Sequence, residues 1–98
     1  MIRIIYTWRI GEDKLEAFIK VWKKATNKIH REVKGARGSF MLQNEKNKTE
    51  IKTIARWDSF DDWKNWWQDR TPDQMKTMHG LGERINIEIF REVDDFTK

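Results

Sequence analysis

Two histidines are the side chains of this sequence best suited to proton transfer, because an imidazole changes its charge near neutral pH. His79 comes four residues after Met75 and directly after Met78, so on a helix it would share a face with Met75. A histidine beside an apolar stripe is either a satisfied structural residue or a proton acceptor. His30 is flanked by charged residues, and we expect it to be solvated or to lie at an interface. The sequence therefore offers His79 as its candidate catalytic base.

Aromatic residues gather in the segment before this histidine. At about 100° per residue on a helix, Phe60, Trp63 and Trp67 share one face, which predicts that they belong to the core. Trp66 lies off the centre of that face, so it either covers a pocket or forms a half-buried surface ring. Trp66 is the second candidate catalytic residue.

Other side chains are candidates for contact with a bound molecule. Tyr6 lies in a predicted strand, and it lines a pocket or faces a partner sheet. Arg56 lies in another predicted strand, where it would meet an anionic group of a substrate or pair with an acidic neighbour. The candidate substrate-binding residues are Tyr6, Thr7, Arg56, Met75 and Met78.

Several classes of site are excluded. The chain has no cysteine, which rules out disulfides, thiolate nucleophiles and thiolate metal ligands. Its two histidines are far apart in the sequence, so no metal site is predicted. Neither of the usual glycine-rich phosphate loops occurs. The segment Glu50–Trp57 lacks the glycine and the paired aromatics of an RNA-recognition strand, so we expect no nucleic acid partner.

Six predicted elements, the last helical one made of two stretches, position these residues. Alternating apolar residues or β-branched and aromatic composition predict four strands, at residues 2–9, 39–45, 50–57 and 84–93. An apolar stripe at helical period predicts a helix over residues 12–33, and Gly35 and Gly38 follow its end. Ser59 is a good N-cap for a short helix over residues 60–68. Thr71-Pro72 begins a further helical stretch, with Pro72 at its first helical position, that ends at Gly80 or Gly82.

The order of these elements is β-α-β-β-α-β, which predicts an α+β, ferredoxin-like fold with an antiparallel sheet and helices on one face. The first strand is apolar on both faces, because Ile2, Ile4 and Tyr6 alternate with Ile5. The last strand carries a row of isoleucines, Ile85, Ile87 and Ile89. Both rows need a cover, and a second sheet is the economical one. We therefore expect a homodimer.

Length and composition agree with one small folded domain over residues 1–98. Charged residues make up 37% of the chain, but six Trp, five Phe and one Tyr supply apolar area that disordered chains lack. No apolar run approaches the roughly 20 residues of a membrane span, and the N-terminus lacks the pattern of a signal peptide. Because the chain also lacks cysteine, we expect a cytoplasmic protein without a membrane partner, and the net charge of +4 is only a weak indication of acidic partners.

Nearly the whole chain resembles the antibiotic biosynthesis monooxygenase family of the dimeric α+β barrel superfamily. The resemblance rests on three motifs: Phe18-x-x-x-Trp22, Gly35-x-x-Gly38-Ser39, and Ala55-Arg56-Trp57-Asp58-Ser59 leading into Phe60-x-x-Trp63. It implies two sheets packed across a twofold axis, with a pocket between sheet and helices in each protomer. It also implies catalysis without metal or flavin on a phenol or hydroquinone, whose anion reacts with O₂ directly.

A second branch of the superfamily degrades haem, and it uses an Asn on the first strand, a Trp on the second helix and a His on the next helix. Trp66 and His79 match the last two, whereas Tyr6 or Thr7 stands in place of the Asn. Three hypotheses follow. The chain is a cofactor-independent monooxygenase of a small aromatic compound, a protein that binds haem or a small apolar ligand, or a dimeric module without pocket chemistry.

Overall fold

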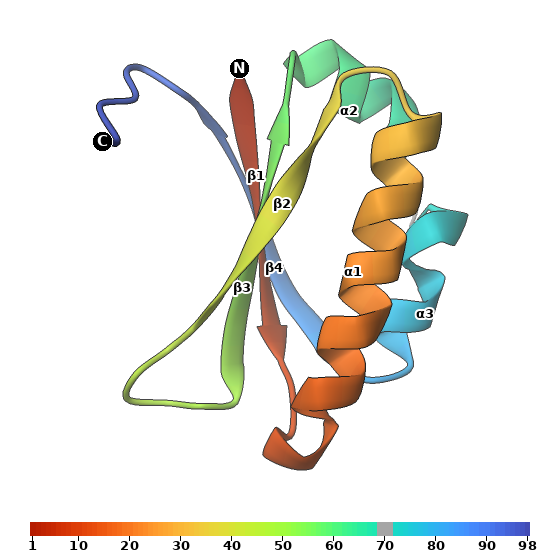
Figure 1. The fold of residues 1–98 in the computed structure, drawn as a ribbon, viewed down its shortest axis with the longest axis vertical. Coiled ribbons are helices and arrows are strands. Elements are labelled where there is room, and N and C mark those ends of the chain that lie inside the picture. Colours follow the sequence, from red (N-terminus) through yellow and green to blue (C-terminus); the bar gives the residue numbers. More distant parts are fainter. Residues whose placement is uncertain (69–71) are drawn as a thin grey trace.

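The computed structural model describes residues 1–68 and 72–98, which form one four-stranded antiparallel sheet with helices on one face (Figure 1). The strand order is β2-β3-β1-β4. The strands are β1 Ile2–Arg9, β2 Ala36–Gln43, β3 Glu50–Trp57 and β4 Glu83–Arg91. The helices are α1 Leu15–Glu32, α2 Phe60–Trp67 and α3 Lys76–His79, with 3₁₀ turns at Glu12–Lys14 and Asp73–Met75. The predicted ferredoxin-like α+β fold is confirmed.

Most predicted boundaries agree with the structure, and the differences have local causes. The second strand begins at Ala36, earlier than predicted, because a shift of register between Ala36 and Ser39 lets β2 continue its pairing with β3. It ends at Gln43, because the Asn44 side chain accepts hydrogen bonds from the backbone of Lys46 and Asn47 and turns the chain. Pro72 flanks the 3₁₀ turn rather than beginning it. Thr71 lies outside the described residues.

Alternate residues of β1 serve the two faces of the sheet, as predicted. Ile2, Ile4, Tyr6 and Trp8 are all buried beneath the helices. They pack with Phe18 of α1 and with residues of β3, α2 and α3 into one core, whose largest fully buried side chains include Trp8, Trp57 and Phe18. The opposite face of the sheet carries no helix in the part of the chain described (Figure 1). We call it the open face.

The isoleucines of β4 do not form a row on the open face. Ile87 pairs with Tyr6 and Ile89 with Ile4, and directly paired residues of an antiparallel sheet point to the same side. These two isoleucines therefore lie on the helix-covered face. A shift of register between Thr7 and Trp8 removes Ile85 from that alternation.

The core prediction for α2 is confirmed at two of its three positions. Trp63 is 5% exposed and Trp67 is 8% exposed. Phe60 is 42% exposed, so its prediction as a core residue is wrong. It is the first residue of α2, and its ring lies 6.0 Å from Trp63 with the Lys64 ammonium 5.9 Å from the ring centre.

No helix of the described residues has the length and apolar character needed to cross a membrane.

Candidate functional site

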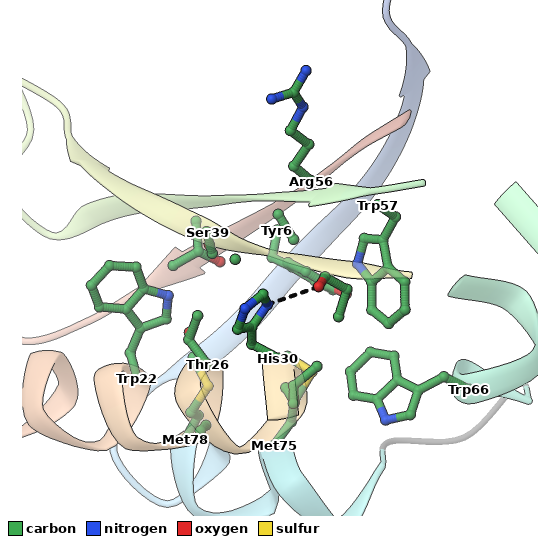
Figure 2. A pocket seen from close by; sticks show the side chains of 16 residues that line it. Tyr6, Trp22, Thr26, His30, Ser39, Arg56, Trp57, Trp66, Met75 and Met78 are labelled. Carbon is green, nitrogen blue, oxygen red and sulfur yellow. Dashed lines mark hydrogen bonds between the residues drawn. The ribbon is translucent and has the colours of Figure 1, made fainter. Parts of the chain in front are cut away.

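A pocket lies between α1, the sheet and the α2–α3 region (Figure 2). Its free space is about 40 Å³, and its walls are mainly aromatic and aliphatic. Labelled side chains that line it are Tyr6, Trp22, Thr26, His30, Ser39, Trp57, Trp66, Met75 and Met78. Five residues expected at a site from the sequence are therefore brought together here, namely Tyr6, Arg56, Trp66, Met75 and Met78.

Helix α1 supplies three of the polar groups of this pocket. Trp22, Thr26 and His30 are spaced four residues apart, which places them on one stripe of a helix. The stripe faces β2 and β3, where Ser39 and Thr53 contribute hydroxyl groups to the same pocket. The sequence predicts the helix that carries these three residues, but not their place in a pocket. The regular spacing was the signal that could have joined them.

His30 has the geometry of an oriented proton acceptor. Its Nδ1 lies 2.9 Å from the carbonyl oxygen of Ala36. Because a carbonyl oxygen only accepts, Nδ1 carries the hydrogen and donates it, and in the neutral imidazole this leaves the lone pair on Nε2. His30 is exposed, as expected, but its ring also lines the pocket. A base at the mouth of an apolar pocket can receive a proton from a bound ligand and pass it to solvent.

The local backbone of β2 brings its residues into the pocket wall. Gly38 has a φ of 95°, which favours glycine, and it lies in the bulge before Ser39. Ser39 then pairs with Ala55, and both line the pocket. Gly35, with a φ of 88°, lies so close to Asp62 that a Cβ atom would collide with that side chain. This close approach holds the start of α2 against the end of α1.

Trp66 covers one side of the pocket. Its ring centre lies 5.2 Å from that of Trp57, and its Nε1 donates to Oε1 of Gln74 at 3.3 Å. Met75 and Met78 are buried beside it. A methionine side chain has three rotatable bonds and adapts to the shape of its neighbours. This part of the wall can therefore rearrange around a ligand larger than the present free space.

Tyr6 is a buried phenol that stays protonated. Its hydroxyl oxygen accepts a hydrogen bond of 3.1 Å from Nε1 of Trp63. Burial raises the pKa of Tyr6 far above its ordinary value of 10.0, and this outweighs the opposite effects of the Trp63 hydrogen bond and the positive charge of Arg84. Tyr6 therefore shapes the pocket but does not supply a base at neutral pH.

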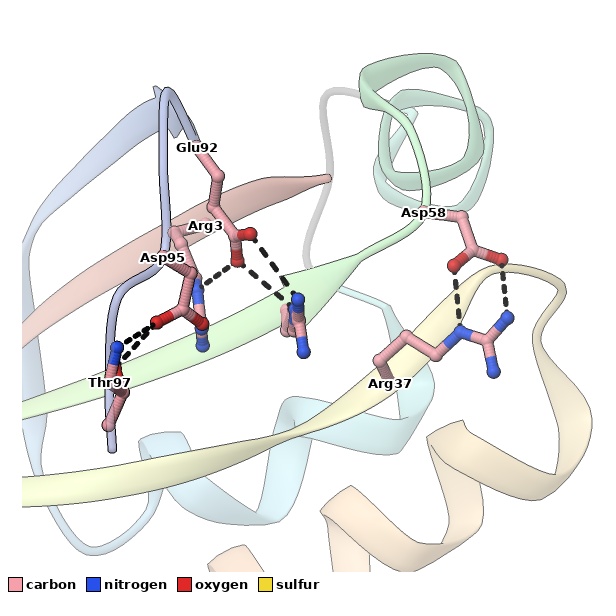
Figure 3. A network of polar contacts seen from close by, with 7 residues as sticks. Arg3, Arg37, Asp58, Glu92, Asp95 and Thr97 are labelled. Atoms are coloured by element: carbon pink, nitrogen blue, oxygen red, sulfur yellow. Dashed lines mark hydrogen bonds and ion pairs between the residues drawn. The ribbon is translucent and has the colours of Figure 1, made fainter.

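Arg56 and Thr7 direct their polar groups away from the pocket. The residue Arg56 borders it, but Figure 2 shows the guanidinium turned away from the other labelled side chains. Its Nε lies 3.1 Å from Oε1 of Glu92, an oxygen that also lies 2.6 Å from Nε of Arg3 (Figure 3). The expected alternative of an ion pair for Arg56 is confirmed. Thr7 faces the other way too, where its hydroxyl accepts a hydrogen bond from Lys52 at 3.0 Å.

The structure does not bring His79 to Trp66. The imidazole of His79 lies 5.3 Å from the Trp8 ring, beside a separate surface hollow that Arg9 and Lys14 also line. Burial lowers the pKa of His79, and the positive charge of Arg84 lowers it further. Met75 lines the pocket, whereas His79, four residues later at the end of α3, lines the other hollow, so their spacing does not bring both side chains to one site.

The site residues do not fit a metal or a haem. Among the described residues no group of three or more His, Asp or Glu side chains could hold a metal ion. Haem ligation by His79 beside Trp66 would need the two side chains in one cavity, and they lie in different ones. The free space of the pocket is about that of a few water molecules. A porphyrin is far larger than this free space.

The chain belongs to the antibiotic biosynthesis monooxygenase family, whose sequence profile matches residues 1–80. No curated protein matches the sequence. Among solved structures, SnoaB, a cofactor-independent oxygenase from Streptomyces nogalater, has a TM-score of 0.75 at 12% identity, over 99% of this chain and 97% of that one. A conserved protein of unknown function from Bacteroides thetaiotaomicron has a TM-score of 0.69 at 17% identity, over 91% and 94% of the two chains. A conserved protein from Methanosarcina mazei has a TM-score of 0.70 at 16% identity, over 93% and 91%. These likenesses show the shared fold, and the predicted family is confirmed.

Proposed function

We propose that the chain is a cofactor-independent monooxygenase that oxidises a small phenol or hydroquinone to a quinone. The observation that carries the proposal is the apolar, tryptophan-lined pocket with an oriented imidazole at its mouth. SnoaB, which shares the fold, is a cofactor-independent oxygenase, and this supports the absence of a cofactor in the reaction. The proposed substrate carries one aromatic ring, because the pocket admits a ring only when Met75 and Met78 rearrange.

The proposed reaction balances with O₂ as the only oxidant. Nε2 of His30 takes the proton of a ring hydroxyl and leaves a phenolate. The electron-rich ring of the phenolate reduces O₂, and a new bond joins a ring carbon to one oxygen atom. The O–O bond then breaks, the same ring carbon loses its hydrogen as a proton, and the second oxygen atom leaves as water. One phenol and one O₂ thus give one quinone and one water.

The pocket supports this chemistry in two ways. Aromatic walls such as Trp57 and Trp66 can stack on the substrate ring and exclude water from it. In a dry pocket a charge pair such as phenolate and imidazolium is stabilised more strongly than in water. His30 replaces His79 as the proposed base, because only His30 combines a fixed tautomer with a place in the pocket wall.

Incubation with resorcinol or hydroquinone under isotopically heavy O₂ tests the proposal. We expect O₂ consumption and a quinone that carries one heavy oxygen atom. The variant His30→Asn retains an amide N–H that can reach the Ala36 carbonyl but has no basic nitrogen. It should lower turnover by about 10²–10⁴, the usual contribution of a positioned base.

His79→Gln is the matched control, because it alters the other histidine of the chain, outside the pocket. Its turnover should remain within about twofold of the unaltered protein. A quinone without heavy oxygen would contradict the proposed reaction. Equal losses in both histidine variants, or a loss only in His79→Gln, would contradict the role of His30.

A further inference from the structure

The indole nitrogen of Trp22 is a buried hydrogen-bond donor that lacks a partner. Solvent does not reach Nε1, and no acceptor for it occurs among residues 1–68 and 72–98. Three other indoles of the chain behave differently. Trp8 donates to Thr53, Trp63 to Tyr6 and Trp66 to Gln74. Since buried donors in folded proteins are nearly always paired, the unpaired indole of Trp22 needs its own explanation.

The position of this donor points to the pocket. Trp22 lines the pocket from α1, and Figure 2 shows its nitrogen turned inward, on the side of Ser39. His30 lies eight residues further along the same stripe of α1. The indole of Trp22 can only donate a hydrogen bond, whereas Nε2 of His30 can accept a proton. Both side chains line the same mainly apolar pocket. A ligand that satisfies both needs two different oxygen groups.

We propose that Trp22 determines substrate specificity, by donating its indole N–H to an acceptor oxygen that the substrate carries in addition to its ionisable hydroxyl. The chemical class is a single-ring hydroxyaryl ketone or a related carbonyl-bearing phenol. An indole N–H favours a ligand with a carbonyl oxygen over one with a methylene or methyl group at that place, because only the oxygen accepts its hydrogen bond. The proposal rests on the proposed function in that it concerns the same pocket.

The rearrangement of Met75 and Met78 that admits a ring also opens the interior to Nε1 of Trp22, since all three residues line the same space. One neutral hydrogen bond is expected to change an affinity by up to about tenfold. The rest of the pocket wall is mainly apolar, apart from His30, Arg56 and the hydroxyl groups of Tyr6, Thr26, Ser39 and Thr53.

Two ligands of similar shape test the proposal by calorimetry under nitrogen, where no oxidation occurs. Both para-hydroxyacetophenone and para-ethylphenol have the ring hydroxyl, but only the first has a carbonyl oxygen. We expect the unaltered protein to bind para-hydroxyacetophenone up to about tenfold more tightly. Trp22→Phe, which keeps a flat ring and removes the N–H, should abolish this preference, so that the variant binds the two ligands equally.

Trp66→Phe is the matched control, because it makes the same change in the same pocket at an indole that already donates to Gln74. It should keep the preference for the ketone. If circular dichroism shows that Trp22→Phe does not fold, Trp22→Leu takes its place.

Three results would overturn the proposal: equal binding of the two ligands by the unaltered protein, binding of neither, or a preference that survives in Trp22→Phe. A preference lost in Trp22→Phe together with no heavy oxygen in any quinone would leave Trp22 as a binding residue. That outcome would remove the proposed function alone.

Discussion

The two faces of the sheet differ in the partners of their polar groups. On the helix-covered face the side chains are mainly aromatic and buried, and their polar atoms pair over short distances, as between Trp63 and Tyr6 or Trp8 and Thr53. On the open face the charged residues Arg3, Arg56 and Glu92 form an ion-pair network (Figure 3). Beside them, large apolar side chains lie exposed: Phe40, Leu42 and Phe90.

This difference separates the face proposed to bind substrate from the face proposed to pair with a second copy. On the helix-covered face three other indole donors are paired, so the unpaired Nε1 of Trp22 stands out there. The open face combines half-buried ion pairs with apolar area, which is typical of a surface that is covered by another protein. The first face is expected to respond to substitution with loss of stability or of ligand binding, and the second with loss of assembly.

The largest effect should come from removing an indole from the core face of α2. Trp63→Ala and Trp67→Ala should each lower the free energy of unfolding by about 3–5 kcal/mol, as for other buried aromatic residues. Trp66→Ala should cost clearly less, because Trp66 is only half-buried and lines the pocket. Chemical denaturation measures all three. An equal cost at Trp66 would show that the pocket wall is as much a part of the core as Trp63.

A smaller effect is expected at the phenol of Tyr6. Tyr6→Phe leaves the N–H of Trp63 buried without its acceptor, which should cost about 1–3 kcal/mol. Because the pKa of Tyr6 is raised on folding, the unfolded state loses its proton first. The free energy of unfolding should therefore be unaffected below about pH 10 and fall above it.

The phenolate absorbance tests this directly, because Tyr6 is the only tyrosine of the chain. We expect the absorbance to rise together with the loss of circular dichroism, and not before it. In Tyr6→Phe the alkaline fall in stability due to this group should be absent. A phenolate signal from the folded protein near pH 10 would contradict the burial of Tyr6.

The fold could be predicted from the sequence because its signals are local. Residues 2–9 and 50–57 match β1 and β3 to the residue, since strict strand patterns end at turn residues. The site was predicted in part. Trp66, Met75, Met78 and Tyr6 line the pocket, whereas His30 was assigned to solvent or an interface and His79 to the site.

The positions of the two histidines depend on tertiary structure. Which face of a long helix meets a pocket depends on how the helix lies on the sheet, and this is a tertiary property. His30 lines the pocket with its Nδ1 2.9 Å from the carbonyl oxygen of Ala36, the residue at which the bulge of β2 begins. His79 ends α3, which follows a 3₁₀ turn, and it lines a hollow outside the pocket. Neither the bulge nor the turn has a strong sequence pattern.

Substitution of Phe90 on the open face should have the smallest effect on the stability of one protomer. It should instead disrupt the pairing of two copies. We propose that two copies pair through this face, so that light scattering of the unaltered protein gives twice the chain mass of 12.0 kDa. Phe90 is 52% exposed and lies beside Arg3 in the pairing of β1 with β4. In a twofold interface the same patch meets itself, so Phe90→Asp places two carboxylates in the contact.

Phe90→Asp should therefore give a protomer-sized particle, while the free energy of unfolding of that protomer changes by only about 0.5 kcal/mol, as for other exposed positions. Phe60→Asp is the matched control, because Phe60 is 42% exposed but lies at the start of α2, on the helix side of the sheet. It should leave the dimer intact. A monomeric unaltered protein, or a dimer that Phe60→Asp dissociates and Phe90→Asp does not, would mean that the exposed apolar residues of the open face have another role than pairing.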